Sequence, residues 1–168
     1  EVKFTSIKAK SKKLPIHLSA SIVKTLSSLV FYLKYLARKN DLIIIDEPEL
    51  NLHPDNQVIL TRLFARLINK GFRLLISTHS DYIIRELNNL IMLSNNKPEV
   101  AKLRDKFHYS SHEFINKDEV SVYYFDFKTK TTFATKSLPI NELGFDIPSI
   151  DDTIDKLNET SEDLFYAI

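Results

Sequence analysis

Short apolar runs that end abruptly on polar residues organise the first half of the chain. The run Leu42–Ile45 ends at Asp46, and about thirty residues later the run Leu74–Ile76 ends at Ser77. A short apolar run bounded by polar residues is typical of a strand that is buried on both faces of a parallel sheet. We therefore expect two neighbouring parallel strands, Leu42–Ile45 and Phe72–Ser77, with helices covering their sheet.

Apolar residues at spacings of three and four predict helices around these strands. One such pattern covers Ser19–Lys39 and places its apolar residues on a single face. A second helix is expected over Pro54–Lys70, because proline suits the first helical turn and Gly71 suits the position just after the end. A third is expected to begin at residue 80 or 81 and to end near Met92. Strands that alternate with helices in this way predict an α/β fold.

The second half of the chain shows a different pattern. The segment Asn95–Glu99 is polar and contains a proline, so the first domain is expected to cover residues 1–95. Residues 96–168 are expected to form a small α+β extension, with a short helix over Val100–Phe107 and a β-hairpin over residues 120–138. Two capping patterns predict two short amphipathic helices in the tail. They are Ser149 with Asp152 and Thr160 with Asp163.

Charge is distributed unevenly along the chain. Residues 1–40 hold nine Lys/Arg and one acid, which gives 9 − 1 = +8, whereas residues 151–168 hold one lysine and six acids, which gives 1 − 6 = −5. The basic beginning contains a weakly alternating segment, Val2–Lys10, and a return at Leu14–Leu18. We interpret it as an edge hairpin solvated by lysines. Attraction of nucleic acid or of nucleotide phosphate is the alternative.

Composition limits the class of protein further. The chain has 168 residues, of which 43% are hydrophobic and 27% charged, as in an ordinary globular protein with one core. It contains no cysteine, which excludes disulfide bonds and thiolate metal sites. No apolar run approaches the roughly 20 residues that a membrane helix needs. We therefore expect a cytoplasmic protein with no membrane partner.

The strand end at Asp46 and Glu47 carries the first candidate chemistry. A carboxylate such as Asp46 suits Mg²⁺ bound to phosphates, because that ion keeps several waters and takes one or two protein ligands. The next side chain along a pleated strand points the other way, so Glu47 is expected to address a water in line with the terminal phosphate. Glu47 would then orient and polarise the attacking water, and Pro48 would fix the exit of the chain.

His79 follows the neighbouring strand and is the second candidate. Its imidazole can donate a hydrogen bond to a γ-phosphate or to the attacking water, and so sense whether ATP is intact. The alternative is an ordinary surface or core histidine. Three hydroxyl residues lie at the same strand end with weaker claims, namely Ser77, Thr78 and Ser80.

Together these residues resemble the motifs of ATP-binding-cassette (ABC) ATPases. Leu42–Glu47 looks like a Walker B strand with its catalytic glutamate, Pro48–Pro54 looks like a D-loop, and Ser77–Ser80 looks like an H-switch. The wording Asp-Glu-Pro-Glu-Leu-Asn-Leu-His-Pro is similar to the SMC, RecF and OLD-like branch and to related AAA-type ATPases. The resemblance covers about residues 14–92 and implies the C-terminal part of a P-loop ABC-type ATPase core.

The resemblance also implies contacts across a dimer. The segment Leu18–Ile22 stands where the family has its Leu-Ser-Gly-Gly-Gln signature, so Ser19 or Ser21 would touch the γ-phosphate of ATP held by a partner subunit. A simple helix N-cap explains Ser19 alone almost as well. Asn51 and His53 would contact the partner from the D-loop-like segment, although the family commonly has aspartate where His53 stands.

The loop that cradles the phosphates of ATP is expected to come from another part of the protein. The sequence has two glycines, Gly71 and Gly144, and neither is followed by Lys-Ser or Lys-Thr. A glycine-rich phosphate loop is therefore not among these residues. We expect the chain to be a C-terminal fragment that works with its own N-terminal ATPase lobe and is inactive in isolation.

The function that the resemblance implies is binding and hydrolysis of ATP with Mg²⁺. Two such domains would close head to tail as a homodimer around ATP, in DNA maintenance or anti-phage defence, with nucleic acid or an effector protein as a further partner. Two alternatives stay open. One is a non-catalytic module for dimerisation or effector docking, and the other is a Mg²⁺-dependent nuclease that uses Asp46, Glu47 and His79.

Overall fold

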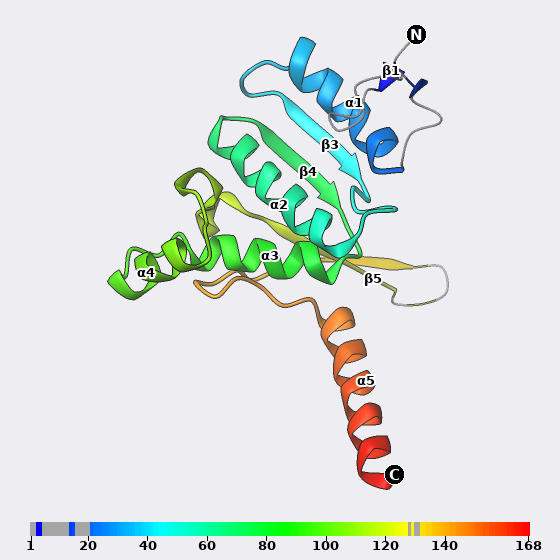
Figure 1. Ribbon diagram of the computed structural model, residues 1–168. Helices are drawn as coiled ribbons and strands as arrows, with labels where there is room; N and C mark the ends of the chain where they lie inside the picture. Colours follow the sequence, from blue (N-terminus) through cyan, green and yellow to red (C-terminus); the bar gives the residue numbers. More distant parts are fainter. Residues whose placement is uncertain (1–2, 5–13, 16–20, 128, 130–131) are drawn as a thin grey trace. The chain divides into compact units, whose positions relative to one another are not determined.

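The computed structural model describes residues 3–4, 14–15, 21–127, 129 and 132–168 (Figure 1). It is a mixed α/β structure that divides into two compact units, Glu1–Ile83 and Ile84–Ile168. The first unit contains both predicted strands and the candidate site. The proposed division into an ATPase core of residues 1–95 and an extension of residues 96–168 remains a prediction.

The first unit is built around a strand–helix–strand arrangement. Strand β3 (Leu42–Asp46) is followed by helix α2 (Pro54–Asn69) and then by strand β4 (Arg73–Ser77), which pairs with β3 in parallel. Pro54 lies at the first position of α2, and Gly71, at φ +88°, follows its end, as the sequence predicts. Short strands β1 (Lys3–Phe4) and β2 (Leu14–Pro15) pair antiparallel, which confirms the predicted hairpin for the residues described.

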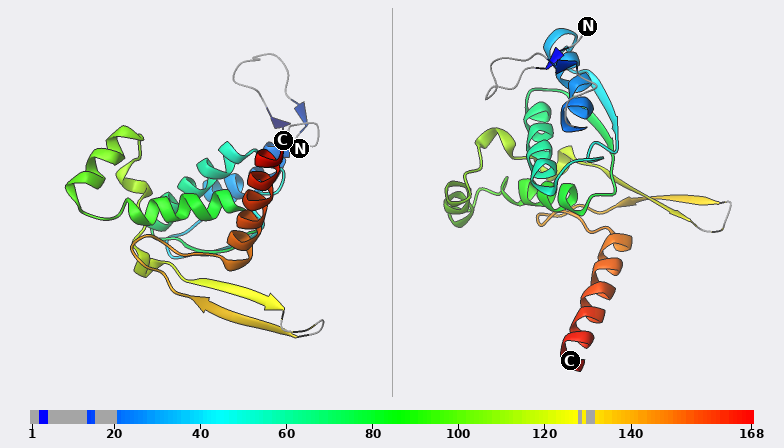
Figure 2. Two further views of the ribbon diagram at one scale, coloured as in Figure 1. Left: turned by 90° about the horizontal axis from the view of Figure 1, so that it is seen from below. Right: turned by 45° about the vertical axis from the view of Figure 1, so that its right-hand side comes forward.

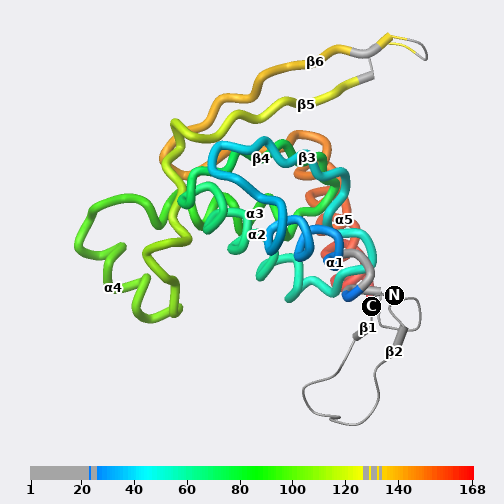
Figure 3. Tube along the Cα trace, turned by 90° about the horizontal axis from the view of Figure 1, so that it is seen from above, coloured from blue at the N-terminus to red at the C-terminus, as the bar shows by residue number. Residues whose placement is uncertain are grey.

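The core of the first unit lies on one face of the β3–β4 sheet. Helix α1 (Ser21–Tyr35) and α2 pack on the same face (Figure 3). The centre of this core is the buried part of α2, chiefly Leu60, Phe64 and Leu67. Apolar side chains of α1 and of both strands pack against that centre: Leu26, Leu29, Leu33, Ile45, Leu74 and Ile76.

The expectation that both strands are buried on both faces is wrong. Burial alternates along each strand. On the face opposite the two helices, three apolar side chains are largely exposed: Leu42 at 50%, Ile44 at 68% and Leu75 at 54%. The physical reason is that both neighbouring helices cover the same face. An uninterrupted apolar run gives no information about which of its two faces the described chain covers.

Helix α1 is shorter than the predicted Ser19–Lys39, and residues 16–20 lie outside the described residues. Asp41 accepts hydrogen bonds from residues at and just after the end of α1. The Arg38 amide donates to the Asp41 carboxylate at 2.8 Å, and the Tyr32 hydroxyl donates to the same oxygen. The Tyr32 hydrogen bond lowers the pKa of Asp41. The bond therefore stabilises the fold at neutral pH, and its contribution is lost as the pH falls through the folded-state pKa of Asp41.

The second unit begins within helix α3 (Asp81–Met92) and continues through α4 (Pro98–Lys106). Two short 3₁₀ turns, Ser111–Glu113 and Lys117–Glu119, lead into the hairpin. The largest fully buried side chains of the second unit are Leu90, Ile91 and Ile115. The helices expected at residues 80–92 and 100–107 are thus present, with small shifts of their ends.

The predicted hairpin is formed by β5 (Val122–Phe127) and β6 (Phe133–Leu138), which pair antiparallel. The segment after the hairpin is bound to α3 by Asn88. The side-chain nitrogen of Asn88 donates to the Phe145 carbonyl at 2.8 Å, and its side-chain oxygen accepts from the Phe145 amide at 3.1 Å. Gly144 is required beside this contact. Its φ is +101°, and a Cβ at this position would lie 2.1 Å from the Asn88 side-chain oxygen.

The two short helices expected in the tail are one continuous helix, α5 (Pro148–Ala167) (Figure 2). Ser149 is not its N-cap, since Ile147 occupies that position without a side-chain cap bond. Thr160 does not start a second helix. Its hydroxyl donates to the Lys156 carbonyl one turn back at 2.8 Å, which a threonine inside a helix can do without interrupting it. None of the described helices is both long and apolar enough to cross a membrane.

We predict that Phe64→Ala lowers the free energy of unfolding of the first unit by about 3–5 kcal/mol, because it leaves a cavity under the sheet. Phe64 is 3% exposed, whereas Ile59 on the opposite face of α2 is 63% exposed. The matched control Ile59→Ala is expected to change stability by about 0.5 kcal/mol or less. Chemical denaturation followed by circular dichroism measures both, and equal effects of the two variants would contradict the described core.

Candidate active site

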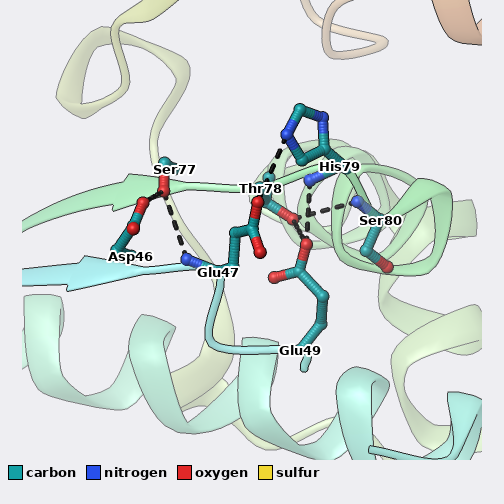
Figure 4. A network of polar contacts seen from close by, with 7 residues as sticks. All are labelled: Asp46, Glu47, Glu49, Ser77, Thr78, His79 and Ser80. Atoms are coloured by element: carbon teal, nitrogen blue, oxygen red, sulfur yellow. Dashed lines mark hydrogen bonds and ion pairs between the residues drawn. The ribbon is translucent and has the colours of Figure 1, made fainter. Parts of the chain in front are cut away.

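The ends of β3 and β4 meet at one edge of the sheet (Figure 4). Asp46 is directly opposite Ser77 in the parallel register, and the Ser77 hydroxyl donates to the Asp46 carboxylate. Both side chains lie on the exposed face of the sheet. In this register the apolar runs Leu42–Ile45 and Leu74–Ile76 finish on polar residues at the same level.

Glu47 is the first residue after β3, and its backbone leaves the strand geometry. Its φ is +41°, in the left-handed region, and its amide donates to both the carbonyl and the hydroxyl of Ser77 at 3.1 Å. The expected alternation along a pleat is therefore not what aims Glu47. The direction of the Glu47 side chain is set by a turn of the backbone, which Ser77 holds on one side and the buried Pro48 on the other. Non-glycine residues in this conformation cluster at functional sites.

The carboxylate of Glu47 lies beside the imidazole of His79. The distance from Glu47 Oε1 to His79 Nε2 is 3.4 Å, and the side chains are 35% and 88% exposed. A pair this exposed adds little to folding stability even when the imidazole is protonated. The pair matters for its position, because it places a hydrogen-bond acceptor, Glu47, and a donor, His79, at the same edge of the sheet, where a bound ligand or water can reach both.

Glu49 joins the loop after β3 to the loop after β4. Its Oε1 accepts hydrogen bonds from the Thr78 hydroxyl at 2.7 Å and from the His79 amide at 2.8 Å. Its Oε2 is buried and has no hydrogen-bond partner among the described residues. The candidate residues from the sequence did not include Glu49. Its position within the Asp-Glu-Pro-Glu run was the available signal, but the sequence gives no sign that its side chain crosses to the next loop.

Ser80 has a structural role. Its hydroxyl accepts from the Ile83 amide at 3.2 Å, which caps the start of α3, and donates to the Gln57 side chain. Gln57 in turn donates to the Leu52 carbonyl at 3.0 Å. Ser80 is 8% exposed, so its hydroxyl is committed to these contacts rather than offered at the strand ends. Of the three candidate hydroxyls, Ser77 is the one beside Asp46.

Two further candidates, Asn51 and His53, belong to the segment between β3 and α2. Asn51, with φ +63°, is exposed in the loop between β3 and α2. His53 caps α2: its Nδ1 accepts from the Asp55 amide at 3.3 Å and lies 3.5 Å from the Asp55 carboxylate. Ser21 begins α1, and Ser19 lies outside the described residues. The structure thus brings together Asp46, Glu47 and His79 at the ends of β3 and β4.

Oxygen donors at the strand ends suit a magnesium ion that is held mainly by phosphates. Asp46 offers a carboxylate and Ser77 a hydroxyl on the exposed face of the sheet. Mg²⁺ in nucleotide sites takes one or two protein ligands and completes its shell with phosphate oxygens and water. Among the described residues, no group of three or more His, Asp or Glu could hold a metal ion by itself. The donor set therefore fits a metal–nucleotide complex better than a metal bound by protein alone.

Comparison with known protein families gives a match over the first half of the chain. Residues 2–84 match the model of the AAA ATPase domain, which supports an AAA-type ATPase domain over this part of the chain. The match contains the strand ends, Glu47, Glu49 and His79. Searches of curated proteins and of solved structures returned no match.

We predict that Glu49→Ala speeds amide hydrogen exchange at His79 by roughly 10- to 100-fold, because the amide loses a hydrogen bond to a charged acceptor. Glu49→Gln is the matched control, since it keeps the Oε1 acceptor, and it is expected to retain most of the protection. Exchange measured residue by residue with NMR tests both variants. Unchanged protection in Glu49→Ala would show that Glu49 does not hold this loop.

Proposed function

We propose that this chain is the C-terminal part of an ABC-type ATPase core of the SMC, RecF and OLD-like branch, and that it hydrolyses ATP together with its own N-terminal lobe. The observation that carries the proposal is the parallel register of β3 and β4, which gathers Asp46, Glu47 and His79 at one edge of the sheet. In open α/β sheets, ligands bind outside the carboxyl ends of the strands, where these side chains lie.

Each of the three residues has a distinct part in the proposed reaction. Asp46, with the Ser77 hydroxyl beside it, would hold Mg²⁺, which when bound offsets negative charge on the phosphates. Glu47 is the general base: its carboxylate orients the attacking water and polarises it toward the terminal phosphate. His79 donates a hydrogen bond to the γ-phosphate or to the same water, from a ring nitrogen 3.4 Å from Glu47.

Positioning supports this assignment more than any single contact does. Glu47 is fixed through its amide to Ser77, and His79 is fixed through its amide to Glu49. The base and the histidine are thus held by backbone bonds between two loops, while their side chains stay exposed. Holding reacting groups in place before the reaction is a large part of catalysis in phosphoryl transfer.

The proposal extends to the assembly. Two ATPase cores would close head to tail over two ATP molecules, with Ser19 or Ser21 of one subunit touching the γ-phosphate held by the other and Asn51 contacting the partner. Hydrolysis would release the pair, so that ATP sets the timing of an attached function. We propose DNA maintenance or anti-phage defence in the cytoplasm as that function, with nucleic acid or an effector protein as the partner.

We predict that Glu47→Gln in the full-length protein leaves ATP binding intact and lowers turnover by roughly 100- to 10,000-fold, since the amide cannot accept the proton of the attacking water. Phosphate release measures turnover, and equilibrium binding of a labelled nucleotide measures affinity. The matched control is Asp55→Asn, which removes a carboxylate that is 88% exposed and outside the group at the strand ends. Undiminished phosphate release from Glu47→Gln would rule out Glu47 as the base.

A further inference from the structure

The C-terminal helix α5 carries an apolar seam with the spacing of a coiled coil. Along its 20 residues and the residue that follows, six positions recur at intervals of 4, 3, 4, 3 and 4. They are Ile150, Ile154, Leu157, Ser161, Leu164 and Ile168. An average interval of 3.5 residues is the period at which two helices wind around each other with the same faces in contact.

This seam is largely open to solvent in the structure. Leu157 is 63% exposed, Leu164 59% and Ile168 fully exposed, and the neighbouring Phe165 is 76% exposed. Ile150 and Ile154 are partly exposed. Figure 2 shows α5 as one regular helix along its whole length. A row of exposed large apolar side chains on one helix face marks a surface that binds another protein surface.

We propose that α5 pairs with α5 of a second copy of this chain, in a parallel two-stranded coiled coil. The identities along the seam select this partner. Ile154 and Ile168 occupy a positions, and Ile150, Leu157 and Leu164 occupy the d positions. From Ile154 to the end of the seam the apolar residues are isoleucine at a and leucine at d, a combination that favours two parallel strands over three or four. Ser161 is the single polar a position of the seam, and such a residue sets the register at a cost in stability.

Most of the charges of α5 lie away from the seam. The e and g positions beside the seam carry mostly uncharged side chains, Thr153, Asn158, Thr160 and Phe165, with Asp151 at the first turn. The other five acids of the helix lie at outer positions: Asp152, Asp155, Glu159, Glu162 and Asp163. In a parallel pair, Thr153 of one helix faces the partner's Asn158, and Thr160 faces the partner's Phe165, so no like charges meet along the seam. A basic partner helix would instead be recognised by acids at e and g.

This pairing is separate from the proposed ATP-dependent dimer. It uses residues of the second unit alone and requires no nucleotide. Because two separate copies must meet to form the pair, association is expected to depend on protein concentration. In the proposed ATPase it would keep two copies together between rounds of hydrolysis and raise the effective concentration of one core near the other.

Light scattering of the full chain after size-exclusion chromatography, without nucleotide, tests the proposal. The unaltered chain is expected to reach the mass of a dimer as concentration rises, and Leu157→Asp with Leu164→Asp to remain a monomer at every concentration. The matched control Asp155→Asn with Glu159→Gln alters outer positions and is expected to dimerise like the unaltered chain. A monomeric unaltered chain, or a dimer that survives both aspartates, overturns the proposal.

Cysteine cross-linking tests the arrangement at a single position, since the sequence contains no other cysteine. Ser161→Cys places a thiol at an a position, where a parallel, in-register pair brings the two copies together, so oxidation is expected to give a disulfide-linked dimer. Glu159→Cys at an outer position is expected to give little. Failure of Ser161→Cys to cross-link, or equal cross-linking of both variants, overturns the parallel pairing whether or not ATP is hydrolysed.

Discussion

The parallel register between β3 and β4 is the constraint on which the candidate site depends. It sets Asp46 opposite Ser77, and from that pair both loops leave the sheet at the same level. The Glu47 amide then bonds to Ser77, and the imidazole of His79 reaches the Glu47 carboxylate. A slip of one residue would turn Asp46 to the opposite face and separate these groups, because side chains alternate along a strand.

Glu49 extends this constraint from the strands to the loops. By accepting from Thr78 and His79 it makes the position of the histidine depend on the loop that follows Glu47. Asp46 and Ser77 share the exposed face of the sheet with Ile44 and Leu75. In the proposed ATPase, the N-terminal lobe would cover this apolar face and place the nucleotide loop beside the same strand ends, so assembly of the core and completion of the site would be one event.

Sequence patterns predicted the individual helices and strands. They did not predict how these elements pack or which side chains cross from one loop to another. Pro54 and Gly71 predicted the limits of α2, and the apolar runs predicted β3 and β4. The runs could not show that both helices cover one face, since a run that is apolar on both faces carries no information about which face a helix packs on. The left-handed turn at Glu47 and the reach of Glu49 are tertiary features without a local signal. In the tail, capping patterns suggested two helices, but the heptad spacing that runs through them belongs to one.

The most direct measurement of the central claim is disulfide mapping of the β3–β4 register. Ile44 and Leu75 are paired in the register, and both are exposed. Neighbouring strands are about 4.8 Å apart, within the range of a disulfide, whereas a displacement of two residues exceeds about 7 Å. The predicted result is a disulfide on oxidation of Ile44→Cys with Leu75→Cys, detected by mass spectrometry, and none in Leu42→Cys with Leu75→Cys. The reverse pattern would contradict the account.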